Sequence, residues 1–349
     1  MAKTFYIIDG HAQIYRAYFA PFRDLTSPTG EPTRATYVFT QMLLNLVNQR
    51  KPDYLAMVID SGDDTVFRKD IFKDYKANRT SPPDDFYPQE QRILEIVRDA
   101  GIPIFAKPGF EADDLIATMA KRLCGGGYET FLVSKDKDLR QTLNDCTKMY
   151  DVQSDEILDP KTLETKYGYS PVEAIEIQTL IGDSTDNIPG IPGVGEKTAV
   201  KLVKKYGSAD AVLKHLDELT PKMRENFEKY ADRLITARRL VTLKDDVEIE
   251  FDPEACKFTG LNTDSLRHYA KMLGFTSLVA RLPAPTPETK KAVIAPAAPR
   301  SPLLFEGSLF GNAPQETAGE TPAIDEDGYA SGVGCKYNLI QTDQQFAEF

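Results

Sequence analysis

Blocks of apolar residues alternate with amphipathic stretches along the first half of the chain. Short apolar runs predict three strands, at residues 4–9, 53–60 and 129–138. Apolar residues recur at helical spacing in three other stretches, at residues 36–49, 88–101 and 111–123. Strands that alternate with helices are typical of an α/β fold, so we expect a mostly parallel sheet flanked by helices.

The pattern changes near Pro171, where strand signals stop and short amphipathic helices follow. We therefore expect an α/β core over residues 1–170 and a helical subdomain over residues 171–282. Residues 283–330 are rich in Pro, Ala, Thr and Glu and bury too little apolar surface to fold alone, so we expect a disordered linker there. The strand-like sequence at 331–349 looks like the start of another domain.

The chain carries a formal net charge of −11 over 349 residues, which by itself argues against a nucleic-acid-binding protein. The meaning of this charge depends on where the acidic residues lie, because an acidic cluster can coexist with local basic surfaces. No apolar run of about 18 residues predicts a membrane span. The N-terminal apolar stretch is too short for a signal peptide, so we expect a cytoplasmic protein.

Cysteine and histidine give no sign of a zinc site. The cysteines are widely spaced and include no C-x-x-C pair, which favours free thiols in a reducing compartment over disulfides or zinc ligands. The histidines are equally scattered. The residues concerned are Cys124, Cys146, Cys256, Cys335, His11, His215 and His268.

Acidic residues follow the three predicted strands at their carboxyl ends. Asp9 and Asp60 end the first two strands, and Asp136 and Asp138 end the third. Ligands of open α/β sheets gather beyond the carboxyl ends of the strands. Residues i and i+2 of an extended chain also point to the same side. We therefore expect these carboxylates to converge.

A second acidic group lies at the start of the helix predicted over 111–123. Helical spacing puts Glu111, Asp113 and Asp114 on one arc and the apolar residues on the opposite arc. Each acid alone is also explained as a solvated surface residue or a helix cap. Together with the strand-end acids they form an all-oxygen ligand set, which favours Mg²⁺ or Mn²⁺. Such sites commonly hold two metals about 3.5–4 Å apart for phosphodiester hydrolysis.

Residues 182–199, GDSTDNIPGIPGVGEKTA, join two aspartates to a glycine-rich turn. The stretch is not an ATP-binding P-loop, because Glu196 separates Gly195 from Lys197 and no strand is predicted before it. A hairpin whose backbone N–H groups meet a nucleic-acid phosphate fits better, although the lysines are also explained as a solvated helix face. The residues expected to bind phosphate are Gly190, Gly193, Gly195, Lys197, Thr198, Lys201 and Lys204.

A basic segment at residues 66–79 also favours nucleic-acid binding. It interleaves Phe67, Phe72 and Tyr75 with basic residues, a pattern suited to a single strand whose bases stack on aromatic rings. The alternative is an amphipathic helix whose aromatic residues face the core, and periodicity does not separate the two. The basic residues are Arg68, Lys69, Lys73, Lys76 and Arg79.

Five segments show that the chain resembles the bacterial flap-endonuclease-like 5′-nuclease family. In chain order they are IIDGHAQIYRAYFA, FRKDIFKDYKANR, GFEADDLIATMA, SKDKDL and GDSTDNIPGIPGVGEKTA. The resemblance is greatest to the N-terminal 5′–3′ exonuclease region of bacterial DNA polymerase I, and it covers residues 3–280. The sequence at 331–349 resembles the join to that polymerase's 3′–5′ exonuclease-like domain. No polymerase activity is expected of this chain.

The resemblance implies a nuclease core with two divalent ions, Mg²⁺ or alternatively Mn²⁺. It also implies a helical arch over residues 66–90 that admits the 5′ strand, and a helix-hairpin-helix (H2TH) DNA-binding motif that often holds K⁺. Lys76 and Arg79 match arch residues that contact the scissile phosphate, with Tyr75 beside them as a stacking candidate. The family's metal-site acids match Asp9, Asp60, Glu111, Asp113, Asp114, Asp136, Asp138, Asp183 and Asp186.

Four positions depart from the family's usual pattern. Arg34 and Val38 stand where glycines are common, and Ser134 and Lys135 stand where a Thr-Gly pair is frequent. These departures concern the local fit to bent DNA and the shape of the turn before Asp136, and they remove no expected ligand.

The resemblance therefore implies a monomeric, structure-specific 5′–3′ exonuclease and 5′-flap endonuclease that acts on DNA and on RNA-primer 5′ ends in replication and repair. A PIN-like ribonuclease would share the sheet and the acids, and a non-catalytic DNA-structure-binding module would share the hairpin. A separate hypothesis is that Ser308, Leu309 and Phe310 dock on the replication sliding clamp. Glu306 stands where Gln is usual, and a chance apolar patch explains the same residues.

Overall fold

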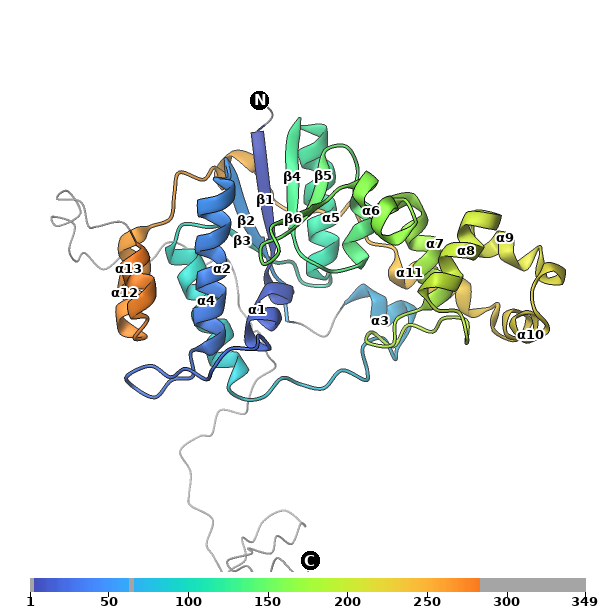
Figure 1. Ribbon diagram of the computed structural model, residues 1–349, viewed down its shortest axis with the longest axis horizontal. Coiled ribbons are helices and arrows are strands. Elements are labelled where there is room, and N and C mark those ends of the chain that lie inside the picture. Colours follow the sequence, from blue (N-terminus) through green and yellow to red (C-terminus); the bar gives the residue numbers. More distant parts are fainter. Residues whose placement is uncertain (1–2, 63–65, 283–349) are drawn as a thin grey trace, which may run out of the picture. The chain divides into compact units, whose positions relative to one another are not determined.

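The computed structural model describes residues 3–62 and 66–282, which belong to one compact unit, Met1–Pro302 (Figure 1). The predicted linker at 283–330, the predicted domain start at 331–349 and the clamp-docking residues 308–310 lie outside the described residues. A six-stranded sheet with the order β3-β2-β1-β4-β5-β6 forms the centre of the described chain. Its strands are β1 (Lys3–Asp9), β2 (Tyr54–Val58), β3 (Ile104–Phe105), β4 (Tyr128–Val133), β5 (Thr147–Asp151) and β6 (Glu156–Leu158).

The sheet is parallel except for its edge strand β6, which confirms the predicted mostly parallel α/β fold. Alternate residues of β1 enter two different cores: Phe5 and Ile7 enter one, and Tyr6 and Ile8 enter the other. Burial on both faces explains why β1 and β2 are almost continuously apolar. Helix α5 (Ala112–Gly125) covers the first face, and α1 (Gly10–Tyr18), α2 (Arg34–Arg50) and α4 (Phe86–Asp99) cover the second (Figure 1).

The register of the sheet aligns the carboxyl ends of its central strands. Ile7 of β1 pairs with Ala56 of β2 and with Leu132 of β4. As a result, the segments that follow the three strands all leave the same edge of the sheet. The acidic residues predicted at the strand ends therefore start from neighbouring positions.

Strand β4 ends earlier than predicted, at Val133. The Ser134 Oγ accepts a hydrogen bond from the Asp136 backbone N–H (3.0 Å), and the Asp136 Oδ1 accepts one from the Asp138 N–H (2.9 Å). Because these backbone N–H groups bond to side chains, they are not available to a neighbouring strand, and the chain forms a loop. Asp138 then begins a 3₁₀-helix, Asp138–Thr142. The two aspartates are thus neighbours in a turn, not alternate residues of a strand.

Short helices follow Pro171, as predicted, and one further helix, α6, precedes that boundary. Helix α7 begins with a capping box, in which Ser170 and Glu173 satisfy each other's backbone N–H groups, and with Pro171 in its first turn. Ile177 of α7 and Phe227 of α10 lie in the same apolar cluster as Phe5. The helices are α6 (Pro160–Tyr167), α7 (Pro171–Ile181), α8 (Glu196–Tyr206), α9 (Ala209–Leu213), α10 (Pro221–Tyr230) and α11 (Arg233–Val241), with a 3₁₀ turn at Leu216–Glu218.

The last part of the predicted helical subdomain packs against the α/β core instead. A 3₁₀ turn (Pro253–Cys256), α12 (Thr263–Met272) and α13 (Thr276–Arg281) follow α11. Leu266 and Phe275 join the apolar cluster that contains Tyr6 and Ile8, and the Phe258 N–H donates to the Asp53 carbonyl (2.8 Å). Helical periodicity identifies these helices but does not say which partner buries their apolar face.

The segment predicted as a helical arch, residues 66–90, contains little helix. Helix α3 covers only Phe67–Ile71, and α4 begins at Phe86. Lys76 has a left-handed backbone (φ 58°), and Pro82 and Pro83 precede α4. Both features interrupt a helix, so turns and extended chain join α3 to α4.

The structure also corrects the expectation of free thiols. Cys124, near the end of α5, forms a disulfide with Cys146, just before β5, with a Cα–Cα distance of 5.6 Å. The residues are 22 positions apart, and only the pairing of β4 with β5 brings them together. Cys256 is free and buried. Within residues 3–62 and 66–282, no helix combines the length and apolar character needed to cross a bilayer.

Candidate active site

Asp9 lies at the carboxyl end of β1 and caps helix α1. Its Oδ1 accepts a hydrogen bond from the Ala12 N–H (3.3 Å), and its Oδ2 accepts one from the Ser134 hydroxyl (2.6 Å). Burial raises the pKa of Asp9 to about 7; the Ser134 hydrogen bond opposes this shift, and the charges of Asp136 and Asp60 add to it. Asp9 is therefore a buried carboxyl group surrounded by other acids.

Three further acids, Asp113, Asp136 and Asp138, belong to the same group of interacting carboxyls. Burial and the charges of Asp136, Asp9 and Asp138 raise the pKa of Asp113 well above its usual range. Burial, followed by the charge of Asp136, raises the pKa of Asp138 to about 7. The structure thus brings together acids from β1, α5 and the loop after β4.

The chemistry of these donors fits divalent cations. Buried carboxylates that raise one another's pKa are destabilised as anions, and a cation among them relieves the repulsion. An all-carboxylate set also suits Mg²⁺ or Mn²⁺. Among the residues that the structure describes, no three acidic, histidine or cysteine side chains are already arranged to hold a metal ion. Several carboxylates around them, those of Glu111, Asp183 and Asp186, form ion pairs with lysine or arginine side chains.

Asp60 follows β2 and contacts two elements. Its Oδ1 accepts a hydrogen bond from the Ala112 N–H (2.8 Å), at the first residue of α5, and its Oδ2 lies 3.1 Å from the His11 Nδ1. Burial alone would raise the pKa of Asp60, but the hydrogen bond and charge of His11 lower it below its usual range. Burial alone would lower the pKa of His11, but its bonds to Asp60 and Glu90 raise it to about 10.

Sequence reasoning did not identify His11, Glu90 or Ser134 as part of the site. His11 follows Asp9 by two residues in DGH, and Ser134 precedes Asp136 by two residues, so closeness to the acids was a usable signal. Glu90 gave no such signal, because it lies within helix α4. Only the fold places its carboxylate against His11.

The structure corrects the prediction that Arg68 binds DNA. Arg68 is 1% exposed, and its guanidinium forms two hydrogen bonds with the Asp114 carboxylate (2.6 and 2.8 Å) and one with Glu111 (2.8 Å). Its Nε also donates to the Leu240 carbonyl (2.8 Å). These contacts join α3, α5 and α11. They also give the fully buried Asp114 a structural partner, so we do not place it among the metal-facing acids.

Tyr75 is likewise buried rather than available for stacking on a base. It is 4% exposed and packs with Ile188, Ala237 and Leu240. Its hydroxyl donates to the Glu111 Oε2 (2.9 Å), and burial raises the pKa of Tyr75 above its ordinary value. Ile188, Ala237 and Leu240 lie more than 100 positions further along the chain. The alternation of basic and aromatic residues at 66–79 therefore could not predict that Tyr75 is buried.

Lys76 and Arg79 face the acids directly. The Lys76 ammonium pairs with Glu111 and lies 3.7 Å from the Asp186 Oδ2. The Arg79 Nε donates to the Asp186 Oδ1 (3.1 Å). Lys137 pairs with Asp183 (2.8 Å). Burial alone would raise the pKa of Asp183, but Lys137 lowers it below its usual range.

Residues 182–191 form a tight turn between α7 and α8. Asp183 and Ile188 exchange backbone hydrogen bonds of 2.9 and 2.7 Å. Gly182 has a φ of 70°, and a Cβ on Gly190 would collide with the Ile181 carbonyl. Gly190 is therefore required by the close approach of two backbone segments.

The other predicted phosphate-binding residues lie at the start of α8. Gly193 and Gly195 are exposed, Gly193 with a φ of 81° and Gly195 as the residue that precedes α8. Lys197 and Lys201 are exposed, and Thr198 is half-buried. By contrast, Lys204 pairs with Glu164 (3.2 Å) and Glu173 (2.8 Å). In the basic segment, Lys73 is exposed, and Lys69, within α3, is half-buried.

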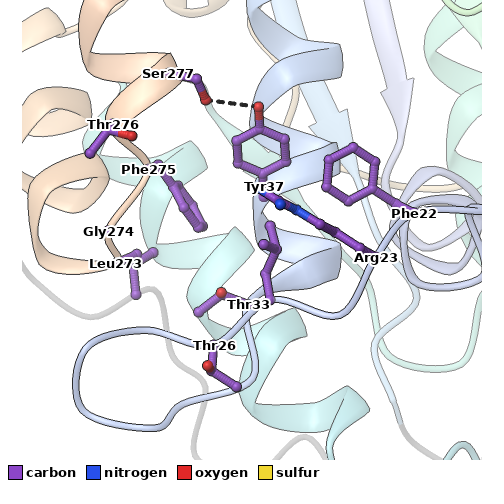
Figure 2. A pocket seen from close by; sticks show the side chains of 11 residues that line it. Phe22, Arg23, Thr26, Thr33, Tyr37, Leu273, Gly274, Phe275, Thr276 and Ser277 are labelled. Carbon is purple, nitrogen blue, oxygen red and sulfur yellow. Dashed lines mark hydrogen bonds between the residues drawn. The ribbon is translucent and has the colours of Figure 1, made fainter.

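A small cavity of about 100 Å³ lies elsewhere, between the loop after α1, the start of α2 and the turn into α13 (Figure 2). Figure 2 shows the Tyr37 hydroxyl beside the Ser277 hydroxyl, at 2.9 Å. Thr33, a buried residue on its wall, has a hydroxyl without a hydrogen-bond partner. None of the predicted metal or phosphate-binding residues lines this cavity.

The chain is similar to known families and to individual relatives. Residues 4–168 match the family described as 5′-3′ exonuclease, N-terminal resolvase-like domain, and residues 169–264 match 5′-3′ exonuclease, C-terminal SAM fold. A 5′-3′ exonuclease of Aquifex aeolicus is 36% identical over 79% of this chain and 94% of its own length. DNA polymerase I of Chloroflexus aurantiacus is 34% identical over 91% of this chain, which spans 35% of that polymerase.

Among solved structures, the bacteriophage T5 D15 flap endonuclease, in a pseudo-enzyme-product complex with DNA and metal ions, has the same fold. The TM-score is 0.57 at 18% identity, over 80% of this chain and 98% of the phage protein. At this identity the likeness concerns the fold.

Proposed function

Since the chain belongs to the 5′-3′ exonuclease family, we propose that it is a divalent-metal-dependent 5′–3′ exonuclease and 5′-flap endonuclease. Its substrate would be DNA with flaps, nicks or RNA-primer 5′ ends. The observation that carries the proposal is that hydrogen bonds hold the acid-bearing elements together at one edge of the sheet. Asp9, at the end of β1, accepts from Ser134 in the loop after β4 (2.6 Å), and Asp60, after β2, accepts from Ala112, the first residue of α5 (2.8 Å).

The acids divide by their surroundings. Asp9, Asp113, Asp136 and Asp138 would hold the metal ions, with Asp60 beside them through its hydrogen bond to α5. Glu111, Asp183 and Asp186 would join only by exchanging their present basic partners. Bound divalent ions would activate water and stabilise the leaving oxygen. We propose Mg²⁺ as the ion, with Mn²⁺ as a substitute, and K⁺ at the turn before α8.

The basic residues would position the substrate. Lys76 and Arg79 lie against Glu111 and Asp186, so a phosphate drawn towards the acids would meet both cations. Lys197 and Lys201, with the N–H groups at the start of α8, would hold the duplex backbone and so determine which phosphodiester lies at the acids.

The DNA polymerase I relatives extend well beyond the matched region, and this chain spans about a third of their length. We propose that the nuclease acts in replication and repair, where 5′ ends must be trimmed beside newly made DNA. We further propose that it acts as a monomer. Clamp docking through Ser308, Leu309 and Phe310 stays a hypothesis that a binding measurement with that peptide would test.

The first experiment would incubate the protein with a 5′-labelled DNA flap duplex, in Mg²⁺ or in EDTA, and size the products. We expect cleavage at or one nucleotide inside the flap junction, with Mg²⁺ only. Asp113→Asn and Asp136→Asn should abolish it, whereas Asp264→Asn, an exposed aspartate on α12, should not.

Three outcomes would overturn the proposal or a part of it. Tight flap binding without cleavage would indicate a non-catalytic DNA-structure-binding module. Cleavage of RNA without any preference for the flap junction would indicate a PIN-like ribonuclease. Full Mg²⁺-dependent cleavage by Asp136→Asn would reject the metal assignment itself.

A further inference from the structure

His11 bridges two carboxylates beside the acidic cluster. Its Nδ1 lies 3.1 Å from the Asp60 Oδ2 and 3.0 Å from the Asp60 backbone nitrogen. Its Nε2 lies 2.8 Å from the Glu90 Oε1. The imidazole is 16% exposed and the Glu90 side chain is 7% exposed, so both groups are largely removed from water.

The contacts continue through Asp60 into helix α5. The Asp60 Oδ1 accepts the N–H of Ala112, the residue before Asp113. A continuous chain of hydrogen bonds therefore runs from Glu90 on α4, through His11 on α1 and Asp60 after β2, to the first turn of α5. His11 fixes the side chain that in turn fixes the start of the helix carrying Asp113.

Burying a carboxylate and an imidazole costs free energy, because both groups lose their contact with water. Apolar residues of similar volume often stabilise a fold equally well. The presence of His11 and Glu90 at this place therefore needs a reason other than packing. Partners that orient a ligand are a common reason, because histidine–carboxylate pairs around metal sites fix the geometry of the groups that bind the ion.

We propose that His11 and Glu90 form a positioning pair, in which Glu90 orients His11 and His11 holds Asp60 towards the divalent metal. Neither residue touches the substrate. This inference rests on the proposed function, and it adds two residues that no acidic or basic pattern in the sequence singled out.

The test compares His11→Ala, His11→Asn and Glu90→Ala with the wild-type protein. An asparagine amide occupies about the place of Nδ1, so His11→Asn retains the contact with Asp60 that His11→Ala loses. The matched control is His215→Ala, because His215 also pairs with a glutamate, Glu218, at 3.1 Å but is 48% exposed and outside the acidic cluster.

The readouts are the Mn²⁺ dissociation constant, from electron paramagnetic resonance of free Mn²⁺, and kcat and KM for flap DNA across a Mg²⁺ titration. We expect His11→Ala to bind Mn²⁺ about 10- to 100-fold more weakly. Its kcat should recover at high Mg²⁺, with KM for DNA within about 2-fold of wild type. His11→Asn should lie near wild type.

Glu90→Ala should shift Mn²⁺ affinity in the same direction, although Glu90 contacts none of the acids that would bind the ion. The double variant should be no weaker than His11→Ala alone, because the two residues act through one contact. Circular dichroism and melting curves would confirm that each variant is folded. If His11→Ala does not fold, Glu90→Ala and His11→Asn still test the pair.

Unchanged Mn²⁺ affinity in a folded His11→Ala, or additive losses in the double variant, would overturn the positioning role and leave the proposed nuclease function intact. A wild-type protein that neither binds Mn²⁺ nor cleaves flap DNA would instead overturn both.

Discussion

The backbone N–H of Lys76 donates a hydrogen bond to the carbonyl of Asp186, over 2.9 Å. Two side chains reinforce this link: the Asn187 Nδ2 donates to the Asp74 carbonyl (2.7 Å), and the Asn78 Nδ2 donates to the Ser184 carbonyl (2.6 Å). The turn before α8 therefore holds the segment that carries Lys76 and Arg79. Their charges are placed at the acids by residues more than 100 positions further along the chain.

Replacing Lys76 or Arg79 by alanine should slow cleavage more than it weakens DNA binding. The cations lie at the acids, where they can stabilise charge that develops on the reacting phosphate. We expect single-turnover rates to fall by about 100-fold or more. Rates at saturating enzyme, together with flap affinity in Ca²⁺, would measure the two effects separately.

The matched control for these variants is Lys161→Ala, an exposed lysine on α6. A loss of affinity as large as the loss of rate would show that Lys76 and Arg79 serve general electrostatic attraction instead.

Lysines along α8 should differ in their contribution to DNA binding. Lys197 and Lys201 are exposed, whereas Lys204 and Lys205 already pair with Glu173 and Glu218. Each phosphate contact that is lost lowers the slope of log affinity against log salt by about 1. The double variant Lys197→Ala/Lys201→Ala should therefore lose about 2 from this slope, and Lys204→Ala/Lys205→Ala much less. Equal changes in the two double variants would contradict phosphate binding at the start of α8.

Arg68 should matter for stability and not for DNA affinity. Replacing it by methionine would leave the buried Asp114 carboxylate without its bidentate partner, which costs about 3–5 kcal/mol of the free energy of unfolding. Arg68→Lys should recover only part of this, since an ammonium group cannot make two parallel bonds. Urea unfolding and flap binding by the folded fraction would check both. A fully stable Arg68→Met that had lost DNA affinity would restore the surface role predicted from the sequence.

Stability should depend on pH through Asp151. Burial alone would raise the pKa of this carboxyl, but hydrogen bonds from Arg16 and Lys135 lower it below its usual range. A lowered pKa in the folded state means that the stabilisation is present above about pH 4 and is lost as the pH falls below that value. Asp151→Asn should therefore cost about 1–3 kcal/mol at pH 7. The difference from wild type should shrink towards zero in acid, and urea unfolding from pH 2 to 8 would measure it. A difference that is constant with pH would show that the charge of Asp151 is not the cause.

The Cys124–Cys146 disulfide should make stability depend on redox conditions. Closing a loop of this length restricts the unfolded chain and contributes about 3 kcal/mol. Dithiothreitol should therefore lower the melting temperature of the wild-type protein by several degrees. Cys124→Ser should melt at the lower temperature with or without the reductant. A thiol titration of the unfolded, unreduced protein that found all four cysteines free would reject the disulfide.

The sequence by itself determined three central strands, the long helices between them and the edge of the sheet at which the acids gather, but not β3, β5 or β6. Short apolar runs identified β1, β2 and β4, because strands in the middle of the sheet are buried on both faces. Helical periodicity identified α2, α4 and α5, because each buries one face. Acids that end parallel strands were predictable neighbours, because such strands align their carboxyl ends.

Only the tertiary structure decided which of the charged and aromatic residues remain exposed. Arg68 and Tyr75 belong to a basic, aromatic segment that suggested a DNA surface, yet both are buried against α11 and Glu111. The disulfide and the contact between His11 and Glu90 likewise join residues far apart in the chain. In each case a side chain is buried by a partner that its own local pattern does not encode, and folding alone brings that partner into contact.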